Sequence, residues 1–224
     1  MYKIEWKKET ALLVIMAVVT AAVIACYPYL PQVLPLHWDI NGNVDQTAPK
    51  SLLSAFFHLG IIWGLYFLLL FGPFIDPKKE KYGDFLDAYR VIRYAVVTVI
   101  CCISLLVTAW ALGVKIPVEK AVPAVVALEL IFVGNMMGKI RMNWLVGVRL
   151  PWTLEDKDVW NRTNRLSGRL FVLSGILSMI SVVFPAIVTF SVLIGSTLLS
   201  ALISAVYSAV IFEKNKKNNG GRHA

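Results

Sequence analysis

Charged residues are scarce in this sequence. Only 16% of its 224 residues are charged, 58% are hydrophobic, and the mean hydropathy is +0.67. Soluble domains average about 25% charged and roughly 45–50% apolar residues. The shortage of charge argues against a soluble enzyme and against a disordered chain, and it favours an integral membrane protein.

Cysteine and histidine are also rare. Three cysteines cannot form a complete disulfide framework, and Cys26, Cys101 and Cys102 all lie in or beside apolar runs, where a free thiol packs as a small hydrophobe. The three histidines are scattered, and neither an HExxH nor a GxSxG motif is present. We therefore predict neither an enzyme, a cofactor nor a disulfide-stapled secreted module.

The apolar residues gather into six runs, and a helix that spans a bilayer needs about 20 residues. The runs are 10–29, 52–75, 91–112, 122–137, 170–184 and 187–212. The first follows a basic N-terminus but lacks a small-residue cleavage site, so we expect a retained span rather than a signal peptide. The runs predict an all-α integral membrane protein with six transmembrane helices.

The net charge of +8 is placed unevenly along the chain. With a cytoplasmic N-terminus and six spans, only Lys50, Lys115 and Lys120 of the 22 Lys and Arg residues fall on the outer side. Cytoplasmic loops of membrane proteins carry the excess of basic residues. The distribution predicts two cytoplasmic termini, and it accounts for the positive charge without direct nucleic-acid binding.

We divide the chain into three segments. Residues 1–76 are expected to form a two-helix membrane unit with an extracellular loop at 31–51, and residues 77–212 a four-helix membrane unit. Residues 213–224 are polar and rich in Asn and Gly, which predicts a disordered cytoplasmic tail.

The outer loop contains the segment LPLHWDINGNVD. Asn41-Gly42 is a strong turn signal, and the flanking residues Leu36 to Trp38 and Val44 can pair as short strands. We predict a small extracellular hairpin with Trp38 at the membrane interface. Its candidate toxin-side ligand-binding residues are His37, Trp38, Asp39, Asn41 and Asp45.

The acidic and amide residues of this hairpin alternate as in a calcium loop. Gly42 stands at position four and Lys50 at position twelve, however, and an EF-hand needs Gly at six and Glu at twelve. His37, Asp39 and Asp45 are candidates for a transition metal, but turn stabilisation by Asx side chains explains them better, and we predict no metal site.

Two polar residues lie within the fourth apolar run. A carboxylate inside a membrane is expensive, so Glu129 either has a function or is protonated and hydrogen-bonded to a neighbouring span. Asn135 follows six residues later, on roughly the opposite helix face. A small proton-coupled transporter or exporter that uses Glu129 is the alternative function.

The sixth run carries serine at every fourth position, at Ser196, Ser200, Ser204 and Ser208. Such small-residue stripes allow close helix approach. We expect the stripe to pack against another span of the chain or a second copy in a homo-oligomer.

A basic amphipathic helix is predicted between the fourth and fifth runs. Pro151 ends the preceding segment, and Thr153 with Asp156 resembles a capping box. Apolar residues follow on one face and basic ones on the rest, with Trp152 and Trp160 as interfacial anchors. The helix either lies on the inner leaflet as a connector or docks a cytosolic partner.

The same stretch carries a motif in a fixed order. Its residues are Gly134, Asn135, Lys139, Asn143, Gly147, Arg149, Pro151, Trp152, Thr153, Trp160, Thr163, Arg165 and Gly168. This order resembles the SdpI family of bacterial membrane proteins, and the outer loop resembles the domain of unknown function that commonly precedes it. Asn164 departs from the pattern, because many members have His there.

The resemblance implies a plasma-membrane protein that binds or neutralises a secreted antimicrobial peptide toxin. It also implies sequestration of a cytosolic ArsR-type repressor at the membrane through the motif residues. The expected partners are therefore the lipid bilayer, an extracellular peptide toxin and this repressor.

Overall fold

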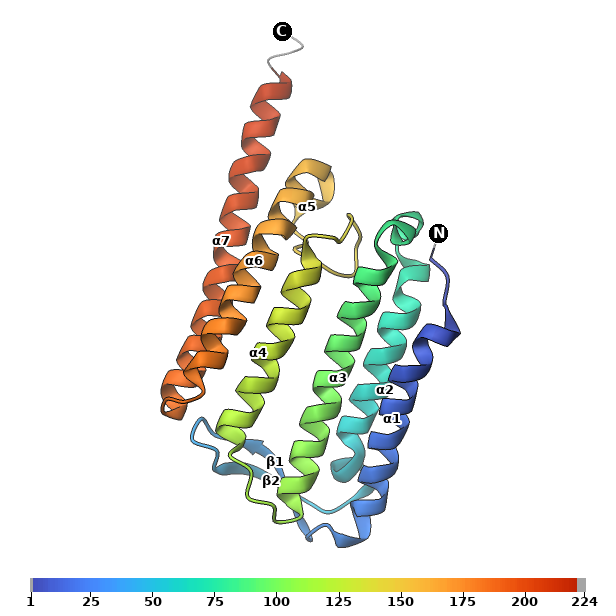
Figure 1. Cartoon of the computed structure of the whole chain (residues 1–224), viewed down its shortest axis with the longest axis vertical. Coiled ribbons are helices and arrows are strands. Elements are labelled where there is room, and N and C mark those ends of the chain that lie inside the picture. The colour runs from blue at the N-terminus through green and yellow to red at the C-terminus, as the bar shows by residue number, and fades with distance from the viewer. Residues whose placement is uncertain (1, 221–224) are drawn as a thin grey trace.

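The computed structural model of the chain describes residues 2–220. Six long helices lie side by side, and the start of the first and the end of the last lie at the same end of the bundle (Figure 1). The elements are α1 (Trp6–Cys26), η1 (Tyr27–Tyr29), β1 (Val33–Trp38), β2 (Val44–Pro49), α2 (Leu52–Ile75), η2 (Lys79–Phe85), α3 (Leu86–Ala111), α4 (Val118–Met137), α5 (Pro151–Glu155), α6 (Lys157–Ser181) and α7 (Ala186–Gly220).

Five helical segments among the described residues are long and apolar enough to cross a membrane. They are Trp6–Tyr29, Leu52–Ile75, Lys79–Ala111, Val118–Met137 and Ala186–Asn218. These segments contain four of the six predicted runs and all of the run 91–112 except its last residue, in agreement with an all-α membrane protein. The fifth run lies in α6, which is not among them, since its first half is rich in charged residues.

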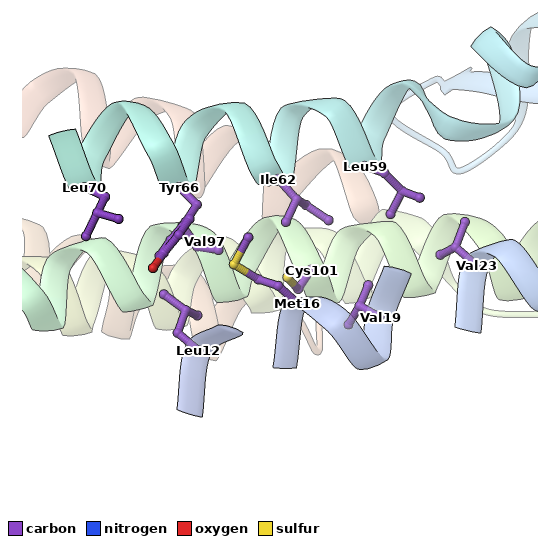
Figure 2. Close-up of a cluster of buried hydrophobic side chains, with 10 residues drawn as sticks. All are labelled: Leu12, Met16, Val19, Val23, Leu59, Ile62, Tyr66, Leu70, Val97 and Cys101. Carbon is purple, nitrogen blue, oxygen red and sulfur yellow. The ribbon is translucent and has the colours of Figure 1, made fainter. Parts of the chain in front are cut away.

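The helices α1, α2 and α3 share one apolar core. Side chains three or four residues apart on α1 and α2 meet two side chains of α3 (Figure 2). The cluster consists of Leu12, Met16, Val19, Val23, Leu59, Ile62, Tyr66, Leu70, Val97 and Cys101. All three cysteines are free, and Cys101 is buried here as a small hydrophobe, as predicted.

Glycines bring α4 and α6 into backbone contact. A Cβ atom added to Gly168 would lie 2.5 Å from the carbonyl oxygen of Gly134, and one added to Gly175 would lie 2.6 Å from that of Ala127. Any larger residue at these positions forces the helices apart. The motif residues Gly134 and Gly168 therefore set the spacing of α4 and α6.

The serine stripe joins α7 to α6 and α5. Ser174 and Ser200 share a hydrogen bond of 2.8 Å, and Ser167 donates one of 2.7 Å to Ser204. Trp152 donates from Nε1 to the Ser208 hydroxyl at 2.7 Å. The prediction that the stripe packs against another helix of the chain is confirmed.

The separate amphipathic helix was a wrong prediction. Its residues form the first half of α6, which continues without a break into the fifth apolar run. The less polar face, which includes Val159, Trp160 and Thr163, is buried in the protein instead of lying on a leaflet. Amphipathicity here reflects contact with neighbouring helices.

The prediction of a disordered tail from Glu213 is also corrected, because α7 continues to Gly220. Asn215 donates from Nδ2 to a carboxylate oxygen of Asp156 at 2.9 Å, which ties this extension to the start of α6. The rest of the predicted tail, residues 221–224 with Arg222, lies outside the described residues.

Candidate functional sites at the two ends of the bundle

The predicted hairpin is present at the end of the bundle opposite the start of α1 (Figure 1). Its strands are antiparallel, and Trp38 pairs with Val44. Gly42 has φ +81°, and the carboxylate of Asp39 accepts the backbone N–H groups of Asn41 and Asn43, both at 2.8 Å. The hairpin and its Asx turn are confirmed.

Hydrogen bonds from Asn43, first from its backbone N–H and then from its side-chain amide, lower the pKa of Asp39. His37 Nδ1 lies 2.7 Å from Asp45 Oδ1 in an exposed pair. Because Asp39 bonds its own turn, the three candidate metal ligands do not converge. Within residues 2–220 no group of three His, Cys, Asp or Glu side chains is placed to hold a metal.

The hairpin is attached to the helices behind it. The Trp38 ring packs edge-on against Trp110 of α3, with 5.4 Å between ring centroids. A Cβ atom added to Gly42 would lie 2.5 Å from Oε2 of Glu119 on α4, so the turn lies directly against that helix. The exposed side chains His37, Asn41 and Asp45 are thus presented on an anchored support.

The opposite end carries residues 138–150, which we call the folded loop. Asn143 is fully buried at its centre. Its Oδ1 accepts the backbone N–H groups of Leu145 and Val146, both at 2.8 Å, and its Nδ2 donates to the Arg141 carbonyl at 2.8 Å. With a further bond from Nδ2 to the Val146 carbonyl at 3.1 Å, one amide satisfies four polar backbone groups and fixes the course of the loop.

Asp76, directly after α2, ties the folded loop to the first three helices. Its Oδ2 accepts the backbone N–H of Trp144 and the hydroxyl of Tyr82, both at 2.8 Å. The sequence prediction did not include Asp76 or Tyr82. The one available signal was a lone carboxylate immediately after an apolar run.

Asn164 ties the folded loop to α6. Its Oδ1 accepts the Val148 N–H at 2.9 Å, and its Nδ2 donates to the Trp160 carbonyl at 3.1 Å. Gly147 has φ +109°, and a Cβ atom there would lie 2.7 Å from Asn164 Oδ1. The position at which this chain departs from the family pattern is therefore a structural contact of the loop.

Two detailed predictions about this region were wrong. Trp160 is not an interfacial anchor, because it is fully buried and donates from Nε1 to the Ile140 carbonyl at 3.0 Å. Thr153 and Asp156 do not form one capping box. Thr153 accepts the Leu150 N–H at 2.8 Å in α5, while Asp156 separately caps α6.

The other motif residues divide by exposure. Pro151 occupies the first turn of α5, where its missing N–H is not needed. Thr163 is buried. Lys139, Arg149 and Arg165 are exposed, and Arg149 donates to the Trp144 carbonyl at 2.6 Å.

An ion pair inside the bundle was missed. Glu9 of α1 and Arg93 of α3 are both buried and hydrogen-bonded to each other. Arg93 also donates to the Tyr2 hydroxyl at 3.1 Å, and the Tyr66 hydroxyl donates to Glu9 at 3.4 Å. The sequence prediction counted Arg93 only as a basic residue of the cytoplasmic side and did not consider Glu9, so their pairing was not foreseen.

Glu129 lines an otherwise largely apolar cavity of about 370 Å³ between α3 and α4, beside Tyr94, Thr98 and Phe132. Its carboxyl group makes no hydrogen bond to another described residue, so the alternative of a bond to a neighbouring span is not present. Asn135 is exposed and donates only to the Ile131 carbonyl of its own helix, at 2.9 Å.

Models of known protein families match two parts of the chain. The model of the SdpI/YfhL protein family matches residues 139–208, which cover the folded loop, α5, α6 and most of α7. The model of a domain of unknown function, DUF1648, matches residues 12–68. No solved structure matches the chain.

A relative with a curated description is similar over nearly the whole chain. It is the immunity protein SdpI of Bacillus subtilis (strain 168), 27% identical over 217 residues, which are 96% of this chain and 100% of the relative. The resemblance predicted from the motif is thereby confirmed. The chain is a multi-pass protein of the bacterial cell membrane whose residues 12–68 are similar to DUF1648 and whose residues 139–208 are similar to the SdpI/YfhL protein family.

Proposed function

We propose that the chain is a membrane immunity protein that binds or neutralises a secreted antimicrobial peptide. The observation that carries this proposal is the similarity to an immunity protein over 96% of this chain and the whole of that relative. The aligned region includes both ends of the bundle. Both candidate surfaces therefore lie in the part of the chain that is similar to the relative.

The hairpin end is the surface that we assign to the peptide. It exposes apolar Val33 and Leu36 beside the polar pair of His37 and Asp45, a mixture suited to an amphipathic ligand. The Asx turn and the contact between Trp38 and Trp110 hold this surface before binding. A preformed surface loses little conformational entropy when its ligand binds.

The test is a gene deletion in the host, complemented by the wild-type gene or by a variant. We expect the deletion strain to become more sensitive to at least one secreted peptide of a panel, and wild type to restore resistance. Leu36→Ser with His37→Ala should restore less than Gln46→Ala, a matched exposed change on β2. Unchanged sensitivity of the deletion strain across the panel would contradict immunity.

We also propose that the folded loop docks a cytosolic repressor of the ArsR type. The folded loop exposes the side chains of Trp144, Arg141 and Arg149, and Trp and Arg are enriched at binding hot spots. The loop fold uses only the backbone groups of Trp144, which bond Asp76 and Arg149. Its side chain is therefore free for a partner.

Membrane fractionation tests this docking. A repressor encoded beside the gene should sediment with membranes that carry the wild-type chain. Trp144→Ala should release it, and Trp6→Ala, a change at another exposed tryptophan, should not. Repressor that stays soluble with the wild-type chain and toxin present argues against this part of the proposal.

The proposed arrangement has six spans, with α6 as the fifth in addition to the five segments named above, and both termini in the cytoplasm. Lys50, Lys115 and Lys120 are the basic residues that the charge count leaves for the hairpin end, which supports an outward-facing hairpin. The folded loop then faces the cytosol, where a repressor is found.

A second candidate function is proton-coupled transport through Glu129. Its support is a carboxyl group that has no hydrogen-bond partner among the described residues and that lines a cavity between two helices. Purified chain in vesicles should then carry substrate with a proton gradient, and Glu129→Gln should abolish flux. A wild-type chain without gradient-dependent flux of any tested peptide or drug would reject transport.

A further inference from the structure

A basic hollow of about 320 Å³ opens between α4 and α6 near the folded loop. It is lined by Gly134, Gly138, Gly168, Asn135, Arg165, Arg169 and Val172. Its lining includes no residue of the hairpin, and neither Trp144 nor any residue that lines the Glu129 cavity.

Three glycines make the hollow possible. Gly134 and Gly168 bring the two backbones together at its base, and neither can carry a side chain there. At Gly138 an added Cβ atom would lie 3.7 Å from Arg165, which is an ordinary van der Waals contact. This part of the wall is therefore open because glycine has no side chain, and a larger residue there would meet no clash at its Cβ atom. The side chains around the opening are those of Arg165, Arg169, Asn135 and Val172, so its only charged groups among the described residues are two guanidinium groups.

These arginines have no acidic partner. Arg165 and Arg169 are four residues apart on one face of α6, and neither forms a salt bridge or a side-chain hydrogen bond with another residue in 2–220. Arg162 on the same helix, by contrast, pairs with Asp158 at 3.0 Å. Two like charges at this spacing repel each other, and an anion between them removes the repulsion.

The depth of the hollow indicates which anion it meets. Gly134 is three residues from Met137, the last residue of α4, which places it about 4–5 Å inside the helix end. Lipid phosphates lie at the ends of membrane-spanning helices, and basic pockets between such helices bind anionic headgroups.

We infer that the basic hollow binds a phosphate ester, namely the headgroup phosphate of an anionic phospholipid. The guanidinium groups of Arg165 and Arg169 donate to the phosphate oxygens, and the glycines leave room for the glycerol backbone. A soluble phosphate compound shares this chemistry but does not reach the hollow from within the leaflet.

The test is native mass spectrometry of the full chain in detergent, titrated with phosphatidylglycerol, phosphatidylcholine, glycerol 3-phosphate or inorganic phosphate. Wild type should retain one phosphatidylglycerol at a concentration at least about tenfold below that for phosphatidylcholine. Arg165→Gln with Arg169→Gln should weaken this binding about 30-fold. Lys157→Gln with Arg162→Gln removes the same charge from exposed sites on the same helix and should weaken it no more than about threefold.

Further variants distinguish lipid binding in the basic hollow from non-specific electrostatic attraction to basic residues. Arg165→Lys with Arg169→Lys keeps the positive charge but loses the paired N–H donors of each guanidinium group. Gly138→Leu fills the hollow and leaves the charge unchanged. Both variants should weaken binding of phosphatidylglycerol. Equal losses in the two Gln doubles, or unchanged binding in Gly138→Leu with normal thermal unfolding, would overturn the proposal. Binding of glycerol 3-phosphate or inorganic phosphate as tight as that of the lipid would overturn the lipid source.

Discussion

Two buried asparagine side chains hold the folded loop at the scale of single residues. Asn143 bonds the loop to itself, and Asn164 bonds it to α6. Both amides replace water for backbone groups that lie in the protein interior. Loss of either one leaves polar groups unpaired, which costs more than the net gain of an average hydrogen bond.

We predict that Asn164→Ala destabilises the chain by about 1–3 kcal/mol, because the Val148 N–H loses its acceptor in a buried site. Thermal unfolding in detergent measures the change. Asn135→Ala is the control, since Asn135 is exposed and bonds only its own helix. Equal melting temperatures for the two variants would show that the Asn164 contact contributes nothing.

The hairpin turn should respond to acid. The folded pKa of Asp39 is lowered, so its contribution is present above the unfolded pKa of about 3.9 and is lost as pH falls through the folded value. Near-UV circular dichroism should report loosening of the Trp38 and Trp110 pair below about pH 4. Asp39→Asn, which cannot titrate, should lack this step, and an identical acid profile would argue against the assignment.

How well each contact could be foreseen follows its separation in sequence. Asp39 and Asn43 are four residues apart, and their chemistry alone predicts an Asx turn. Asn164 and Val148 are 16 residues apart, and Asp76 and Trp144 are 68 apart. Only the fold brings these pairs together, so the hairpin site was predicted in detail and the folded loop was not.

At the scale of elements, glycine residues set how closely α4 and α6 pack. We predict that Gly168→Ala destabilises the packing of α4 against α6 by about 1–3 kcal/mol, because its Cβ atom would clash with the Gly134 backbone. Gly195→Ala is a matched control within α7, where an added Cβ atom meets nothing within 4 Å. Thermal unfolding of both variants measures the change in stability. Equal destabilisation by the two substitutions would contradict a close crossing of α4 and α6.

Helices could be predicted where composition alone sets them. An apolar run of sufficient length becomes a buried or lipid-facing helix whatever its neighbours are, which explains the agreement for α1 to α4 and α7. α6 shows the limit of this argument. The amphipathic pattern of its first half indicates that one helix face is buried. The pattern does not distinguish burial against lipid from burial against other helices.

At the scale of the whole molecule, the proposed orientation makes a labelling prediction. With Cys26, Cys101 and Cys102 replaced by alanine, Lys115→Cys at the hairpin end should react with a membrane-impermeant thiol reagent in intact cells. Lys79→Cys at the other end should react only after lysis. Both lysines are exposed in the fold, so labelling of Lys79→Cys in intact cells would reverse the topology.

The division of the molecule into units stays a prediction. The DUF1648 match lies inside the predicted segment 1–76 and the SdpI/YfhL match inside 77–212. Contacts nevertheless cross this division, as at Gly42 with Glu119 and at Asp76 with Trp144. The apolar runs and the resemblance indicated the two segments, whereas their attachment depends on side chains distant in the chain.

The Glu9–Arg93 pair imposes an order on biogenesis. The two residues are 84 positions apart, so α1 and α2 leave the ribosome well before α3 supplies the cation. Until then the carboxyl group of Glu9 has no counter-charge, and such a group is costly within a bilayer. The first two helices alone therefore leave Glu9 without the cation that it meets in the fold, and the pair forms only once α3 is present.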